Sequence, residues 1–134
     1  MKKAILFGAL ALAGVLTLPA GAAHAKKSVP PVTALDADND GTVDLAEVNK
    51  SAEELFARLE KDNDGTIDRK EMQGRLSRKE FSAADPDDDK TIGKDEFLAL
   101  VASLFKEADP DNDGTLDAAE FRSTKGKALL RVTR

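Results

Sequence analysis

The sequence contains no cysteine, tryptophan or tyrosine, and its only histidine is His24. The lack of cysteine excludes a disulfide framework, a thiolate nucleophile and a soft thiolate site for zinc or copper. The lack of histidine after residue 24 removes the imidazole that most often serves as a general base. The chemistry that remains must rely on oxygen-bearing side chains.

A single long apolar run covers residues 4–18 and follows two lysines. Pro19 interrupts it, and an Ala-His-Ala sequence ends at Ala25. This order is typical of a secretory signal peptide cleaved after Ala25, so we predict a signal peptide over residues 1–25 and a periplasmic location. A membrane anchor is the alternative, but the run is short for a span of about 20 residues and a small-residue cleavage site follows it.

Acidic residues outnumber basic ones by 25 to 20, and removal of residues 1–25 makes the formal net charge two units more negative than −5. A surplus of negative charge opposes binding to a phosphate backbone, so we expect no nucleic-acid partner. No later stretch is apolar enough to cross a bilayer, so we expect no membrane contact once the signal peptide is removed. The acids are concentrated in four short segments.

The clearest acidic segment is residues 109–120, DPDNDGTLDAAE. Acids occupy positions 1, 3, 5, 9 and 12, while Gly114 stands at position 6 and the apolar Leu116 at position 8. Hard cations need six to eight oxygen ligands, which alternate carboxylates supply together with the backbone carbonyl of position 7, here Thr115. Glycine at position 6 accepts the positive φ that the turn requires. The segment therefore matches an EF-hand metal loop.

The same pattern occurs three more times, at residues 36–47, 60–71 and 85–96. We number the segments in chain order as loops 1 to 4, and they begin 24 or 25 residues apart. Loop 2 begins with Glu60, and loop 3 has Lys90 at position 6 and Gly93 at position 9. One acidic turn is often only solvated surface, but a repeat in both acids and flanking apolar residues indicates four metal sites.

The predicted ligands are the carboxylates of these loops and the backbone carbonyl of each position-7 threonine. They are Asp36, Asp38, Asp40, Thr42, Asp44, Glu47, Glu60, Asp62, Asp64, Thr66, Asp68, Glu71, Asp85, Asp87, Asp89, Thr91, Glu96, Asp109, Asp111, Asp113, Thr115, Asp117 and Glu120. Because every clustered acid already has a ligand position, no carboxylate pair is left for acid–base catalysis. We therefore expect a non-enzymatic protein.

The short spacers of 12 or 13 residues between the loops predict shared helices. Residues 45–59 carry apolar side chains at helical spacing without glycine or proline, so one helix is expected to join loops 1 and 2. Residues 95–108 show the same pattern between loops 3 and 4, with Leu104 on the apolar face. Between loops 2 and 3, Gly74 interrupts and Ser77 begins a capping box, which predicts two short helices with a turn between them.

These elements predict an all-α fold. We expect a compact helical bundle in which four EF-hand loops share helices and pair as 2/3 and 1/4 at opposite ends. In each pair the apolar residues at position 8 are expected to form a short β-bridge, Ile67 with Ile92 and Val43 with Leu116. Residues 26–33 include two prolines and are expected to be a flexible linker before a metal-binding domain over residues 34–134.

After loop 4, residues 118–123 are expected to begin a helix that Gly126 interrupts. The chain then ends in an apolar cluster formed by Ala128, Leu129, Leu130 and Val132. We expect this tail to pack on the bundle as core, and the alternative is a contact with a second copy or a partner. A monomer is therefore expected, with a metal-dependent dimer as the alternative, and the sequence indicates no particular protein partner.

Loops 1, 2 and 4 each hold five carboxylates, because position 9 is also acidic. The attraction between a carboxylate and a cation grows with the charge of the cation, but so does the cost of dehydrating it. The fifth carboxylate therefore favours a trivalent ion of calcium's size over Ca²⁺, but this argument gives the sign of the preference and not its magnitude. Acids at position 9 also occur in ordinary calcium loops, so on the residues alone both a trivalent ion and Ca²⁺ remain open.

The sequence resembles the lanmodulin family, the periplasmic lanthanide-binding EF-hand proteins of methylotrophic bacteria. The resemblance rests on the signal peptide, the loop spacing, proline at position 2 of loops 3 and 4, aspartate at position 9 and the apolar tail. It implies selective binding of lanthanide(III) ions of the La, Ce and Nd class, with Ca²⁺ as a weaker ligand, and folding on metal binding. It also implies a role in lanthanide uptake or trafficking that supports lanthanide-dependent alcohol oxidation.

Several residues depart from the family pattern. Ala37 and Lys61 replace the position-2 proline in loops 1 and 2, and Glu60 is one methylene longer than aspartate. In loop 3, Lys90 must adopt a positive φ or distort the loop, and Gly93 removes the fifth carboxylate. We therefore expect loops 1 and 4 to bind tightly, loop 2 less well and loop 3 weakly or not at all.

Two rival functions use similar loops. A calcium buffer or sensor of the calmodulin kind is the first, although shared helices oppose the opening of a loop pair that needs independent helices. A dockerin-like calcium module is the second, but such modules have two loops appended to an enzyme, and this chain has four. We expect a lanthanide-binding protein, with a periplasmic calcium buffer or sensor as the alternative.

Overall fold

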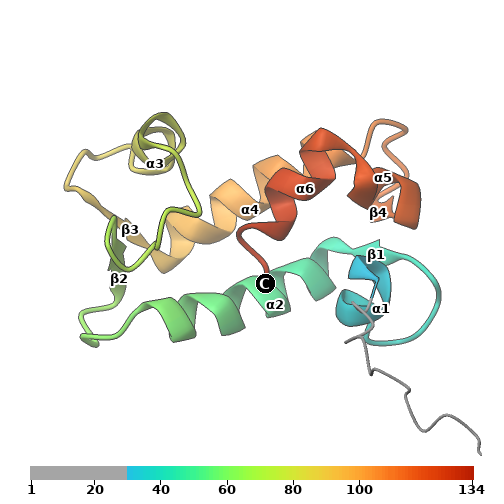
Figure 1. Ribbon diagram of the computed structural model, residues 1–134, viewed down its shortest axis with the longest axis horizontal. Coiled ribbons are helices and arrows are strands. Elements are labelled where there is room, and N and C mark those ends of the chain that lie inside the picture. Colours follow the sequence, from blue (N-terminus) through green and yellow to red (C-terminus); the bar gives the residue numbers. More distant parts are fainter. Residues whose placement is uncertain (1–29) are drawn as a thin grey trace, which may run out of the picture.

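Six helices and four very short strands make up the part of the chain that the computed structural model describes, residues 30–134 (Figure 1). The predicted signal peptide and the first residues of the predicted linker lie outside the described residues. In chain order the elements are α1 (Pro31–Leu35), β1 (Val43–Asp44), α2 (Leu45–Leu59), β2 (Thr66–Asp68), α3 (Arg78–Ala84), β3 (Thr91–Gly93), α4 (Lys94–Ala108), β4 (Thr115–Leu116), α5 (Ala118–Arg122) and α6 (Thr124–Leu130).

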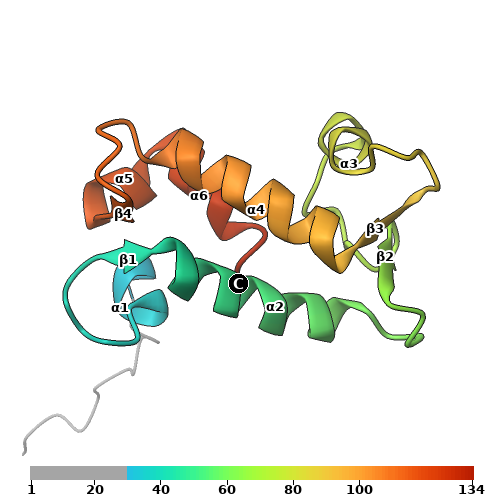
Figure 2. The same cartoon turned by 180° about the vertical axis from the view of Figure 1, so that it is seen from behind.

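The two long helices α2 and α4 lie side by side and separate the loops into two groups, as both views show (Figures 1 and 2). Each helix turns an apolar face inward, and the rings of Phe56 and Phe97 meet at 5.6 Å between centroids. Loops 1 and 4 lie at one end of this helix pair and loops 2 and 3 at the other. Helix α2 has the predicted bounds, and α4 begins one residue earlier than predicted.

Two small antiparallel sheets join the loops within each group. Strand β1 pairs with β4, which sets Val43 opposite Leu116, and β2 pairs with β3, which sets Ile67 opposite Ile92. All four side chains are fully buried. The apolar residue at position 8 of each loop therefore anchors that loop to its neighbour and to the core.

Helix α1 begins within the segment predicted to be a linker. Its first residue is Pro31, so residues 31–33 are helical. Proline is favourable at the first position of a helix because its fixed φ suits the helix and its missing N–H has no intrahelical partner there. Val32 and Leu35 are buried, and this burial stabilises a helix of only five residues.

The predicted short helix after loop 2 is wrong. Residues 69–76 form a series of turns, in which one bond from the Met72 N–H to the Asp68 carbonyl is followed by tighter bonds over three residues. Gln73 and Gly74 both adopt positive φ, at 52° and 73°, and this ends any helix. The predicted capping box is confirmed: Ser77 begins α3 and exchanges hydrogen bonds with Glu80.

The prediction that Gly126 interrupts the last helix is also wrong. Gly126 lies inside α6, and the break falls at Ser123, whose hydroxyl accepts a hydrogen bond from the Gly126 N–H at 2.9 Å. A Cβ at Gly126 would lie 2.2 Å from the Glu120 carbonyl oxygen, so only glycine lets α6 approach α5 this closely. The tail packs as core, as predicted, with Leu129 and Val132 fully buried.

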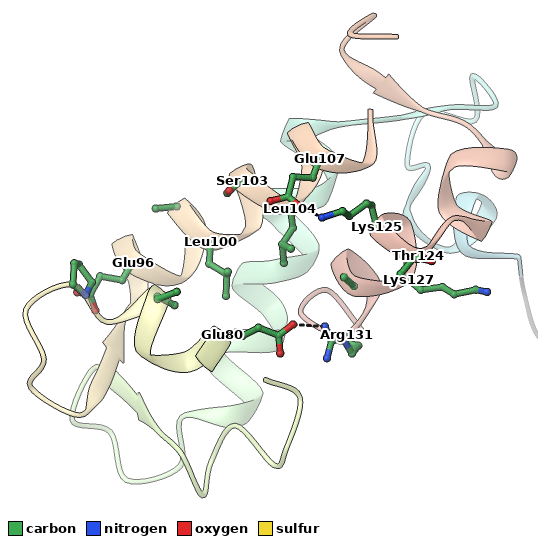
Figure 3. Close-up of a pocket in the computed structure, with 15 residues that line it drawn as sticks. Glu80, Glu96, Leu100, Ser103, Leu104, Glu107, Thr124, Lys125, Lys127 and Arg131 are labelled. Atoms are coloured by element: carbon green, nitrogen blue, oxygen red, sulfur yellow. Dashed lines mark hydrogen bonds and ion pairs between the residues drawn. The ribbon is translucent and has the colours of Figure 1, made fainter. Parts of the chain in front are cut away.

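An open groove of about 940 Å³ runs between α3, α4 and α6 (Figure 3). Leu100 and Leu104 line it and are only half-buried, so Leu104 packs against the core, as predicted, and also forms part of the groove wall. An ion pair between Glu80 and Arg131, 2.7 Å long, joins α3 to the end of α6 across the groove. No helix within residues 30–134 is both long and apolar enough to cross a membrane.

Candidate metal centres

Each of the four loops brings three carboxylates together. In each group one oxygen from every member lies within 4.8 Å of the others, a separation that lets one cation touch all three. The groups are Asp36, Asp38 and Asp40 in loop 1; Glu60, Asp62 and Asp64 in loop 2; Asp85, Asp87 and Glu96 in loop 3; and Asp109, Asp111 and Glu120 in loop 4. The longer Glu60 side chain at position 1 is thus accommodated.

Position 6 shapes each loop by donating its N–H to the acid at position 1. These bonds are 3.0 Å from Gly41 to Asp36 and from Gly114 to Asp109, and 3.1 Å from Lys90 to Asp85. The donor must adopt positive φ, and Lys90 does so at 77°. Loop 3 therefore keeps the shape of the other loops, but the backbone of Lys90 is strained. The Lys90 ammonium pairs with the exposed carboxylate of Asp88.

Position 4 contributes a feature that the sequence analysis missed. Asn39, Asn63, Asp88 and Asn112 all have φ between 56° and 62°. Asparagine and aspartate tolerate the left-handed region better than other residues with a Cβ, which explains their presence at this position. The signal in the sequence was the recurrence of asparagine or aspartate between the acids at positions 3 and 5.

The threonine at position 7 holds the aspartate at position 5, a second role that was missed. In loop 1 the backbone N–H and the hydroxyl of Thr42 both donate to Asp40 Oδ1, at 2.8 Å each. These bonds lower the pKa of the Asp40 carboxyl, and the corresponding threonines lower those of Asp64 and Asp89. In loops 1 to 3 the threonine therefore orients the position-5 carboxylate and favours its ionised form.

The aspartate at position 9 accepts backbone N–H groups that follow it, and in loops 1 and 4 it thereby caps α2 and α5. Asp44 Oδ1 accepts the Glu47 N–H at 2.8 Å, Asp68 does the same for Glu71, and Asp117 accepts the N–H groups of Ala119 and Glu120. None of the three belongs to a converging carboxylate group of its loop. The carboxylate at position 9, which the sequence offered as a fifth ligand, thus accepts backbone N–H groups at the end of its loop.

The glutamate at position 12 is held differently in the two halves of the chain. In all four loops its Oε2 accepts the N–H of position 9. In loops 1 and 2 its Oε1 also accepts the N–H of position 2, at 2.6 Å from Ala37 to Glu47 and 2.9 Å from Lys61 to Glu71. Loops 3 and 4 have proline at position 2, and their glutamates join the converging groups.

Loop 4 contains a buried carboxylate oxygen without a partner. Asp109 is only 6% exposed, and within the described residues its Oδ1 accepts no hydrogen bond. Burial raises the pKa of Glu120, and the nearby carboxylates of Asp111, Asp117 and Asp109 raise it further. An orphaned buried anion beside repelling carboxylates is costly unless a cation compensates it. A hard cation held by oxygen ligands fits this donor set.

A sequence model of the EF-hand family, described as EF hand, matches residues 33–50 and 100–123. The two segments contain loop 1 and loop 4, which the structure pairs through β1 and β4. These matches support an EF-hand protein. Together with the acidic groups they support binding of divalent or trivalent cations such as Ca²⁺. No curated protein sequence matches the chain.

Proposed function

We propose that this EF-hand protein is a non-enzymatic, periplasmic binder of trivalent lanthanide ions that folds on metal binding and serves lanthanide uptake or trafficking. The single observation that carries the metal-binding part is the buried, unpartnered Asp109 oxygen among the converging carboxylates of loop 4. The repetition of such groups in the other three loops extends the proposal from one site to four.

In each loop the three converging carboxylates would hold the cation, with the position-7 carbonyl and water completing six to eight ligands. The cation would neutralise carboxylates that otherwise repel one another across a gap of a few ångströms. Metal binding would therefore supply much of the folding free energy, since the core contains few aromatic residues to offset this repulsion.

The preference for a trivalent ion rests on charge and on the resemblance to lanmodulins. Loops 1, 2 and 4 carry five acids each, and the two acids outside the converging group add negative potential within the same twelve-residue loop. The periplasmic location rests on the signal-peptide pattern of residues 1–25.

A periplasmic calcium buffer or sensor is the second candidate, and one observation favours it. The position-9 aspartates of loops 1 and 4 cap helices, and that of loop 2 binds N–H groups of the turn after it, so their presence has an explanation that does not involve the charge of the metal. If these N–H groups largely balance the negative charge of the position-9 aspartates, each loop attracts a cation about as strongly as an ordinary calcium loop does.

The deciding experiment follows helicity by far-UV circular dichroism while buffered La³⁺ or Ca²⁺ is added to the purified protein. Folding at a free La³⁺ concentration far below the Ca²⁺ concentration that has the same effect would support the lanthanide proposal. Equal responses to the two ions at similar concentrations would support the calcium protein. No response to either ion would contradict both candidates.

Secretion is tested separately, by expressing the full chain with a C-terminal tag in a Gram-negative host and isolating the periplasmic fraction. A periplasmic product that begins at residue 26 is expected. Retention in the cytoplasm with the first 25 residues intact would contradict the signal peptide.

A further inference from the structure

We propose that the residue at position 2 of each loop controls whether the position-12 glutamate is free to bind the cation. A backbone N–H at position 2 holds the glutamate in loops 1 and 2, and proline releases it in loops 3 and 4. The inference rests on the proposed cation-binding function and adds to it one residue that affects the strength of each site.

The hydrogen bonds in loops 1 and 2 engage both oxygens of the glutamate. Glu47 accepts the Asp44 N–H on Oε2 at 3.0 Å and the Ala37 N–H on Oε1 at 2.6 Å. Glu71 has the same two bonds, with Lys61 as the donor to Oε1 at 2.9 Å. In both loops the three converging carboxylates are those of positions 1, 3 and 5, without the glutamate.

Loops 3 and 4 differ in only one of these two bonds. Gly93 and Asp117 donate to Oε2 of Glu96 and Glu120, at 2.8 and 2.9 Å, as position 9 does elsewhere. The donor to Oε1 is missing because Pro86 and Pro110 have no N–H. In these loops the glutamate replaces position 5 in the converging group.

The difference alters the cost of using the glutamate as a bidentate ligand. In an EF-hand loop, position 12 supplies both of its oxygens to the cation. In loops 1 and 2 the Oε1 oxygen must either give up its charge-assisted hydrogen bond from the position-2 N–H or accept from that N–H and the cation at the same time. In loops 3 and 4 no N–H competes with the cation for this oxygen. Partial replacement by water reduces the loss, so we expect about a tenfold difference in affinity.

The orphaned Asp109 oxygen independently marks loop 4 as the site most prepared for a cation. Its carboxylate is more than nine-tenths buried, belongs to the same converging group as Glu120, and has one oxygen without a partner among the described residues. In loop 1 the corresponding Asp36 Oδ1 accepts the Asp40 N–H at 3.1 Å. At positions 1 and 12, loop 4 thus holds two carboxylate oxygens without a donor among the described residues, whereas all four such oxygens of loop 1 accept hydrogen bonds.

The test exchanges the two residue types between loops 1 and 4. Ala37→Pro removes the competing donor from loop 1, and Pro110→Ala introduces one into loop 4. Binding of buffered La³⁺ is followed loop by loop through the amide NMR signals of Gly41, Gly65 and Gly114, because each N–H donates to the position-1 acid of its own loop. We expect roughly tenfold tighter binding in loop 1 of the first variant and roughly tenfold weaker binding in loop 4 of the second.

A third protein separates the loss of the N–H from the fixed φ of proline. Lactic acid in place of Ala37, introduced by semisynthesis, gives an ester that lacks the N–H but leaves φ free. Tightening of loop 1 in both the ester and the Ala37→Pro protein supports the inference. Tightening in the proline variant alone assigns the effect to φ and overturns it.

Loop 2 serves as the internal reference in all three proteins, because its Lys61 donor is unchanged. Unchanged midpoints for loops 1 and 4 relative to loop 2 would overturn the inference while leaving metal binding intact. If the glycine amides respond to neither La³⁺ nor Ca²⁺, the proposed function itself fails, and the inference fails with it.

Discussion

At the scale of single residues, the acids of a loop have different uses, as loop 1 shows. Positions 1 and 3 converge on the candidate cation position, position 5 joins them while a threonine orients it, and position 9 caps a helix. The hydrogen-bond donors that surround a carboxylate thus decide its use. A count of acids in the sequence therefore overestimates the number of carboxylates that meet at one point.

Lys90 has a backbone conformation that is unfavourable for lysine, because its φ of 77° favours glycine. We predict that Lys90→Gly tightens La³⁺ binding by loop 3 about fivefold, since the strained φ, which costs about 1 kcal/mol, is required only in the formed loop. The measurement is the titration midpoint of the Thr91 amide NMR signal. Lys90→Ala is the control, because it removes the same charge but keeps the strain. Equal tightening in both variants would assign the effect to charge.

Gly126 is required for a different reason, the close approach of α6 to α5. We predict that Gly126→Ala lowers the free energy of unfolding by about 1–3 kcal/mol, since the added Cβ would overlap the Glu120 backbone carbonyl. Urea denaturation of the metal-loaded protein measures this. Gly93→Ala is the matched control. The φ of Gly93 is −70°, and an added Cβ would have the Glu96 Oε2 atom, at 3.7 Å, as its nearest neighbour. Similar losses in both variants would contradict the steric explanation.

At the scale of elements, Glu80 connects α3 to α6. Its carboxylate accepts the Ser77 N–H at 2.7 Å and pairs with Arg131 at the end of α6. Hydrogen bonds with Ser77 and then with Arg131 lower the pKa of Glu80 to about 2. Because this value lies below the ordinary pKa of 4.5, the ionised group stabilises the fold above pH 4.5, and that contribution is lost as the pH falls toward 2.

We therefore predict that Glu80→Gln lowers the free energy of unfolding by about 1 kcal/mol at pH 7, a value reduced for the partial exposure of the pair. The difference between variant and wild type should shrink below pH 4.5 and close near pH 2, as measured by urea denaturation at fixed metal concentration. Glu53→Gln, in an exposed pair with Lys94, should have a smaller effect without this pH dependence. A constant difference across pH would contradict the role given to Glu80.

Helices proved predictable where an apolar pattern and a boundary signal coincide, as in α2 and at the Ser77 start of α3. The turns after loop 2 were not predictable, because no local pattern announces the positive φ of Gln73. Gly126 looked like a helix breaker, but its role depends on a contact with α5 that only the folded chain reveals. Similarly, ligand spacing identified the loops, whereas the capping role of position 9 depends on where the helices begin.

At the scale of the whole molecule, the loops are connected in two ways. Helices α2 and α4 join loop 1 to loop 2 and loop 3 to loop 4 along the chain, while β1–β4 and β2–β3 join loops from different helices. The strand pairs connect loops directly through buried residues of position 8, whereas the helices separate their loops by the length of the bundle (Figure 2). Ordering of one loop should therefore favour ordering of its strand partner most strongly.

This arrangement predicts that Glu120→Gln, which weakens loop 4, also weakens La³⁺ binding by loop 1 about fivefold, the lower end of usual coupling between sites. Loops 2 and 3 should change less, because only a helix connects them to the altered pair. The glycine amides of loops 1 and 2 and the Thr91 amide of loop 3 report each site by NMR. The matched variant Glu71→Gln in loop 2 should weaken loop 3 and spare loop 1. Equal effects on every remaining loop would mean that the long helices transmit the change as well as the strands do, and that the protein orders as one unit.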